Sequence, residues 1–191
     1  DDTSTFNKGG TLTLTSDNSQ TVINDYTSGQ DWGNVVISTS GSGITGNISA
    51  IKVTSLTINN NSTWDGASQT LTFLGSGTPL SIGTGATFTT TSSTTIYAGT
   101  SATNITATQY DNLTLTPASG TATYTLLGDL TTTKEMTGGL TISADATLSS
   151  GVSNFDIGLA GNWVNGGTFT PNSNDVYFTS TTSQTLNSGG V

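Results

Sequence analysis

Apolar residues alternate with Thr, Ser or Asn in short runs along most of the chain. Six such runs in its second half are Asn112–Thr116, Ala122–Leu127, Leu140–Ser143, Asn162–Val164, Thr168–Thr170 and Val176–Thr179. An alternation of period two puts the apolar side chains of a β-strand on one face and the polar ones on the other. The sequence therefore predicts many short strands, each with one buried face and one face rich in Thr.

The composition also favours strands over helices. Thr occupies 43 of the 191 positions, whereas the helix formers Glu, Lys, Arg and Met are almost absent. Only 8% of the residues are charged, but hydrophobic residues still make up 31% and alternate regularly, which argues against disorder. We therefore predict an all-β protein with no helix longer than about two turns.

The two halves of the chain resemble each other. Asp31–Ser38 (DWGNVVIS) matches Gln109–Thr116 (QYDNLTLT), and further matches follow in the same order at a nearly steady offset. Gly9–Ile23 also resembles Gly166–Phe178, and no linker separates the copies, so we expect one continuous array. The predicted division is a partial closing repeat at 1–28, which another copy could exchange as a strand, repeat 1 at 29–108 and repeat 2 at 109–191.

Matching residues of the two repeats should occupy matching places in the fold. We expect Ile58 and Ile142 to be buried, and Lys52 and Lys134 to lie at equivalent surface positions. Aromatic residues at matching strand positions are expected in the core, namely Phe88 with Phe169 and Tyr97 with Tyr177.

Two architectures fit this pattern. The first is an elongated β-solenoid, similar to a parallel β-helix, built from tandem repeats of about 82 residues. It explains the missing linker and the outward Thr pairs at Thr114/Thr116 and Thr123/Thr125. The second is a pair of tandem β-sandwich domains, which the irregular spacing of the runs favours. We favour the solenoid.

Several classes of function are excluded by what the sequence lacks. The absence of His and Cys removes nucleophilic triads, histidine bases and the usual zinc sites. A net charge of −9 without any Arg provides no basic patch for nucleic acid or for an anionic membrane. No apolar run is long enough for membrane insertion. We therefore predict a protein that is not an enzyme and holds no cofactor.

The acidic residues lie mostly in turn contexts. Asp17, Asp65 and Asp129 each neighbour Asn or Gly, where Asp normally hydrogen-bonds its own backbone. We therefore favour turn capping over paired-carboxylate catalysis. Calcium is a weaker alternative, because carboxylate and carbonyl oxygens suffice to bind it, and the stretches to inspect are Asp1-Asp2 and Asn172–Asp175.

The candidate ligand-binding residues are Trp32, Trp64 and Trp163, which lie near Gly or Asn. An exposed Trp ring beside polar groups could stack on a sugar, although capping of the solenoid edge is the interpretation that we favour. Flat Thr ladders could also bind ice. That function requires a nearly constant coil length, and the uneven spacing of the strands counts against it.

Neither end of the array carries a polar or helical cap. The first predicted strand and its border are Thr11, Leu12, Thr13, Leu14 and Thr15, with little charge nearby. Unpaired strand edges seek partners, so we predict head-to-tail self-association through this segment. The segment could be donated to a neighbouring copy, or it could fold back as the first coil of its own chain.

Five motifs resemble the tandem β-strand repeats of bacterial surface and secreted proteins: YDNLTL (Tyr110–Leu115), GDLTT (Gly128–Thr132), GGLTI (Gly138–Ile142), LAGNWVNGGTFTPNSNDVYF (Leu159–Phe178) and SQTL (Ser183–Leu186). They are similar to repeats of filamentous haemagglutinins and autotransporter passengers. The resemblance implies a non-catalytic extracellular structural protein, a cell-surface stalk or a self-assembling fibre subunit. The start at Asp1 without Met further suggests a chain from which a signal peptide has been removed. An adhesin that binds glycans through its Trp residues is the alternative.

Overall fold

The computed structural model describes residues 10–15, 20–23, 31–39, 44–46, 50–66 and 68–189. In these residues the chain forms strands β1 to β21 and a single short 3-10 helix, η1 (Thr132–Lys134). No α-helix occurs in the described part of the chain, which confirms the all-β prediction.

The strands stack on three faces, which the chain visits in turn as it coils. The first face holds sheet A, with β1 (Thr11–Leu14), β3 (Asn34–Ile37), β6 (Ser55–Ile58) and β9 (Leu80–Ile82). A bridge between Gly77 and Thr103 joins this face to sheet D. Sheet D consists of β12 (Thr103–Ile105), β14 (Ala122–Leu126), β16 (Ala146–Ser149) and β19 (Thr168–Thr170).

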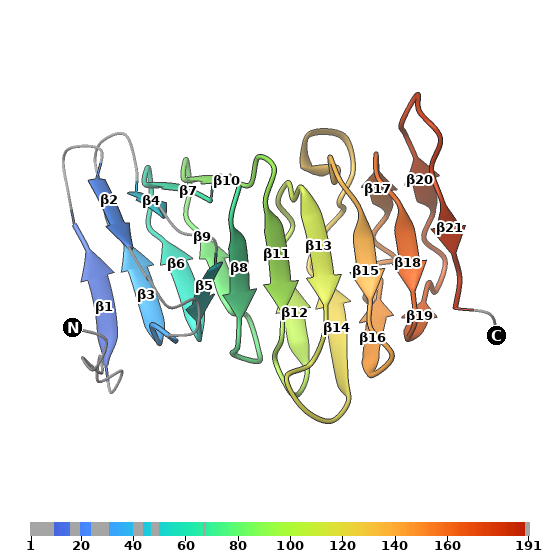
Figure 1. Ribbon diagram of the computed structural model, residues 1–191, viewed down its shortest axis with the longest axis horizontal. Coiled ribbons are helices and arrows are strands. Elements are labelled where there is room, and N and C mark those ends of the chain that lie inside the picture. The colour runs from blue at the N-terminus through green and yellow to red at the C-terminus, as the bar shows by residue number, and fades with distance from the viewer. Residues whose placement is uncertain are drawn as a thin grey trace.

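The other two faces are built in the same way. The second face holds sheet B, with β2 (Gln20–Ile23), β4 (Ile44–Gly46), β7 (Thr63–Asp65) and β10 (Thr87–Thr89), and sheet E, with β17 (Ile157–Leu159) and β20 (Val176–Phe178). The third face is sheet C, with β5 (Ala50–Val53), β8 (Thr70–Phe73), β11 (Thr94–Tyr97), β13 (Asn112–Leu115), β15 (Leu140–Ile142), β18 (Trp163–Asn165) and β21 (Leu186–Asn187). Figure 1 shows the coils following one another along the long axis, with β1 near one end and β21 near the other.

Every strand pair in the described residues is parallel, as a solenoid requires and an antiparallel Greek-key sandwich does not allow. The β-solenoid prediction is therefore confirmed. The coils differ in length, because Thr94 pairs with Asn112 over a short coil, whereas Leu113 pairs with Leu140 over a much longer one.

The core is a continuous column of inward side chains that runs along the solenoid axis. Aliphatic residues of the strands dominate it, and aromatic rings join neighbouring coils near its middle. The ring of Tyr97 lies 5.1 Å from Phe73 and 6.3 Å from Tyr110, centroid to centroid. Burial of each such side chain contributes about 1.5–3 kcal/mol, so the stacking of coils is what stabilises these very short strands.

The expected equivalence of the two sequence repeats does not hold in space. Ile58 and Ile142 are both buried, but Ile58 belongs to sheet A and Ile142 to sheet C. The expectation was wrong for the aromatic pairs. Phe88 is buried in β10 while Phe169 is half-buried in β19, and Tyr97 is buried while Tyr177 is 45% exposed.

The lysine pair differs for the same reason. Lys52 lies half-buried on β5 of sheet C, whereas Lys134 is exposed in η1. The unit that repeats in space is a coil of variable length. The sequence offset that leads from Asn34 to Asn112 therefore moves from sheet A to sheet C instead of returning to the same face.

Candidate functional surfaces

The outward side of sheet C carries an in-register column of side chains, which we call the sheet C column. Its members are Lys52, Thr72, Ile96, Thr114, Thr141, Val164 and Asn187. A second column beside it contains Ala50, Thr70, Thr94 and Asn112. Adjacent strands lie about 4.8 Å apart and alternate residues about 6.6 Å apart, so the outward side chains form a two-dimensional grid.

Unequal coil length does not disturb this grid. The extra residues of long coils lie between the strands, for example at 127–138, while the residues of sheet C keep their pairing. The expectation that unequal coil length would misalign the outward side chains is therefore wrong for sheet C, because insertions at the corners leave the strand register unchanged. The aligned column is mixed, with Thr at three of its seven positions.

The Thr hydroxyls of the two columns are not used to hold the fold together. Within the described part of the chain, the hydroxyls of Thr70, Thr94, Thr114 and Thr141 make no hydrogen bond to protein. Other polar side chains do link the coils, as when the Ser143 hydroxyl donates to Leu115 O at 2.8 Å. The hydroxyls of the sheet C face are therefore available to a ligand or to water.

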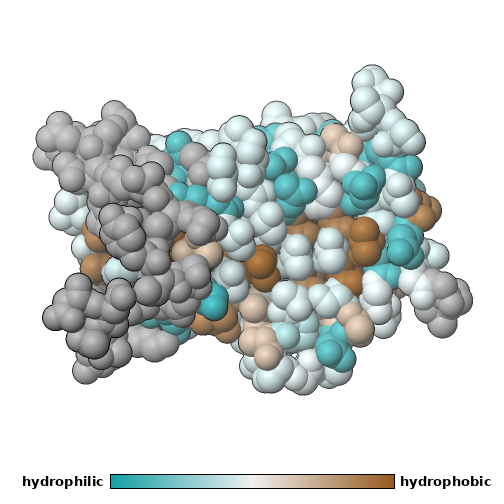
Figure 2. Space-filling view, viewed as in Figure 1, coloured by the Kyte–Doolittle hydropathy of each residue, from teal (hydrophilic) through white to brown (hydrophobic). Residues whose placement is uncertain are grey.

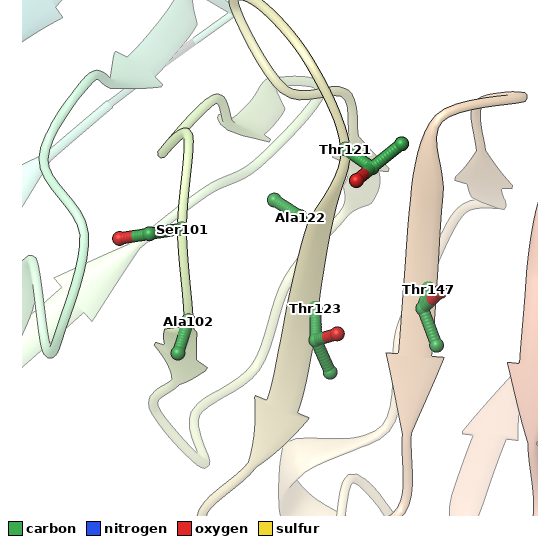
Figure 3. A pocket seen from close by; sticks show the side chains of 6 residues that line it. All are labelled: Ser101, Ala102, Thr121, Ala122, Thr123 and Thr147. Atoms are coloured by element: carbon green, nitrogen blue, oxygen red, sulfur yellow. The ribbon is translucent and has the colours of Figure 1, made fainter.

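Sheet D carries a shallow hollow on its outward side (Figure 3). Its volume is about 230 Å³, and it is lined by Ser101, Ala102, Thr121, Ala122, Thr123 and Thr147. Thr123 and Thr147 are register partners on β14 and β16. The lining offers only hydroxyl and methyl groups, so it contains no group that could act as a general acid or base near neutral pH.

The sugar-binding hypothesis requires exposed Trp rings, but the structure buries the rings of Trp64 and Trp163. Trp64 is 1% exposed in the core, in register with Phe88, and Trp163 is buried with its ring 4.9 Å from that of Phe169. Trp32 is partly buried against the core. Neither Trp64 nor Trp163 presents a ring face on which a sugar could stack, because each occupies an inward position of a short strand.

A buried tyrosine pair lies in the middle of the solenoid and was not predicted. The Tyr97 and Tyr110 hydroxyls are 2.8 Å apart, and the Tyr110 hydroxyl donates to Thr106 O at 2.8 Å. Burial raises the pKa of Tyr97 to about 12 and raises the pKa of Tyr110 well above its ordinary value. Both hydroxyls therefore stay protonated near neutral pH and link two coils through hydrogen bonds rather than acting as nucleophiles.

Three aspartates form a ladder across successive coils. Asp129 Oδ1 accepts a hydrogen bond from the Asp156 N–H at 2.9 Å, and Asp156 Oδ1 accepts one from the Asp175 N–H at 2.8 Å. Asp175 Oδ2 then accepts from the Tyr177 hydroxyl at 3.1 Å, and this bond raises the pKa of Tyr177. Asp129 thus caps the backbone of the next coil, not its own turn as the sequence suggested.

Of the two stretches singled out for calcium, only Asn172–Asp175 lies in the described residues. Asp1 and Asp2 lie outside the described residues, and the Asn172 amide donates to Gly151 O at 3.0 Å, which ties two coils together. Across the described ranges, no group of three or more His, Cys, Asp or Glu residues could hold a metal. The same residues contain no helix with the length and apolar character needed to cross a membrane.

Comparison of the chain with protein-family models, with curated proteins and with solved structures found no match. The resemblance to bacterial surface repeats therefore stays a prediction that rests on the quoted motifs.

Proposed function

We propose that this chain is a non-catalytic structural module of an extracellular stalk or fibre, in which coils stack end to end. The observation that carries the proposal is the apolar surface left on the coil formed by β19, β20 and β21. Leu113, Leu140, Trp163 and Leu186 form one inward column in register, and their exposed fractions are 1%, 1%, 4% and 63%. Leu186 thus occupies a core position that no later coil covers in the described residues.

A second core column ends in the same way. Phe178 continues the position of Leu159 in sheet E, and its exposed fraction is 40% where that of Leu159 is 0%. A further coil placed on this surface would bury both side chains and pair the open backbone of β21 and β20. Such burial is the main favourable term in protein association.

The opposite end of the described array begins with β1. β1 pairs in parallel with β3 of its own chain, in the fold-back arrangement, and Leu12 and Leu14 are half-buried against the core. In the described residues its other edge has no strand partner. Contact between this end of one copy and the β19–β21 end of another is head-to-tail, and such contacts propagate as a filament unless they close.

The extracellular location in this proposal is supported by composition and by the quoted motifs. The chain is rich in Thr and has only three basic residues. Trp64 and Trp163 do not support the adhesin alternative, because both rings are buried.

We expect the wild-type protein to form linear oligomers as its concentration rises, and Leu186→Lys to weaken that association at least about tenfold, since about 1.4 kcal/mol corresponds to a factor of ten. A lysine ammonium at Leu186 would have to be buried without a partner at the end-to-end contact. Sedimentation velocity over a range of concentrations measures the effect.

Val152→Lys is the matched control, because Val152 is fully exposed in the loop between β16 and β17, in the coil before the terminal one, and it continues neither core column. It should associate like the wild type. A wild-type protein that stays monomeric at high concentration would remove the fibre part of the proposal.

A further inference from the structure

We propose that the outward face of sheet C binds the surface of ice. This inference is independent of the stacking function, because it concerns the side of the solenoid and not its ends. Its accessible part extends over the five strands β11, β13, β15, β18 and β21, or about 19 Å at a strand spacing of about 4.8 Å, because Thr72 on β8 is only 9% exposed. From Thr72 to Asn187 the sheet C column contains no charged side chain.

The chemistry of the face suits ordered water. Thr114 and Thr141 each present a hydroxyl and a methyl group, and Ile96 and Val164 add apolar surface in the same column. Figure 2 shows a band of weakly polar and hydrophobic side chains across the middle of this view, with more hydrophilic residues along its borders. A charged side chain would arrange water molecules around itself. The hydroxyl and methyl groups of this face can instead hold water at regularly repeating positions.

The geometry favours a periodic ligand. The columns repeat at about 4.8 Å along the solenoid and about 6.6 Å along each strand. Water molecules on the planes of ice repeat in two directions at comparable spacings. The hydroxyls of Thr114 and Thr141 are bonded to no protein group in the described residues, so they can join such a lattice without breaking any contact of the fold.

Other ligand classes fit this face less well. Protein partners are usually anchored by aromatic or Arg side chains in pockets, and nucleic acids need a basic surface. A soluble sugar is normally held against an aromatic ring. The outward columns of sheet C contain no aromatic residue and no Arg, and Lys52 at their edge is the only basic member.

Sheet C is a better candidate than sheet D. Sheet D also has an outward Thr column, formed by Thr123, Thr147 and Thr168, but this column covers only the three strands β14, β16 and β19. The hollow in Figure 3 lies between its β12 and β14 sides, so this face is not flat. The difference between the two faces provides a matched control.

The test uses the full chain and slowly growing polycrystalline ice as the probe. We expect the wild-type protein to be enriched in the ice fraction and to shape single ice crystals in solution. Thr141→Lys, on the middle strand of the accessible part of the sheet C column, should reduce enrichment at least tenfold, because a long charged side chain holds the lattice away from the face. Thr147→Lys on sheet D should behave as the wild type, and thermal melting should show that both variants are folded.

Three outcomes would overturn the proposal. The wild type could fail to enter ice, a folded Thr147→Lys variant could lose binding while Thr141→Lys retains it, or the wild type could bind crystalline cellulose or chitin and not ice. Leu186→Lys should keep its ice binding. If Leu186→Lys loses self-association but still enters ice, the two proposals can be tested independently of each other.

Discussion

Replacing Trp64 by Ala will lower the free energy of unfolding by about 3–5 kcal/mol, the usual cost of removing a large buried aromatic side chain. Trp64 is 1% exposed and lies in register with Phe88 on the next coil. Its loss leaves a cavity that short strands on both sides cannot fill without losing their pairing. Urea denaturation followed by circular dichroism measures the effect.

Tyr177→Ala is the control for this prediction. Tyr177 is also an aromatic residue on a strand of the second face, but it is 45% exposed, so its replacement should cost less than about 1 kcal/mol. If Trp64→Ala kept wild-type stability and instead abolished binding to a glycan array, the assignment of Trp64 to the core would be wrong and the adhesin alternative would regain support.

A methyl group added at Gly167 will be equally disruptive. A Cβ atom there would lie 2.2 Å from the carbonyl oxygens of Ala146 and Ser143 on the preceding coil. Backbone atoms cannot rotate away as a side chain can, so β16 and β19 would have to separate. We expect Gly167→Ala to destabilise the protein by about 3 kcal/mol, the upper part of the range for overpacking.

The neighbouring Gly166→Ala variant is the matched control, because its Cβ would lie at an ordinary distance of 3.5 Å from Ile142 O. Its stability should stay within about 0.5 kcal/mol of the wild type. Thermal melting of the two variants side by side gives the comparison. Equal stability for both would mean that the coils are not packed backbone to backbone at β16 and β19.

The fold class could be predicted from the sequence because local patterns determine it. The alternation in Asn112–Leu115 sends Leu113 and Leu115 into the core and Thr114 outward, as the structure shows. The face to which each strand belongs could not be predicted. Parallel stacking pairs residues one coil apart, and coils differ in length, so the position of a residue in the sequence does not give its face.

The same reason explains the features that were missed. Asp129, Asp156 and Asp175 lie far apart in the sequence, and only the stacking brings them together. A signal was present, since each Asp precedes an apolar residue that pairs with another coil: Leu130, Ile157 or Val176. The alignment of the outward columns of sheet C was not expected for a related reason, because insertions that look disruptive in the sequence lie at the corners of the coils.

Coils of unequal length stack in register along the whole of sheet C. The chain contains no Cys, so pairs of introduced cysteines can be spin-labelled without background. Lys52→Cys would be combined in turn with Thr141→Cys, Val164→Cys and Asn187→Cys, which lie on β15, β18 and β21 of sheet C. Pulsed electron–electron double resonance would give the three distances.

The stacked solenoid predicts distances of about 19, 24 and 29 Å, because the three positions lie four, five and six strands from Lys52 at a spacing of about 4.8 Å. The increments should be equal, and each distribution should be narrow. Distances that do not increase with strand number would contradict the stacked solenoid. So would distances that increase in proportion to the separation in residue number, as expected for two separate domains.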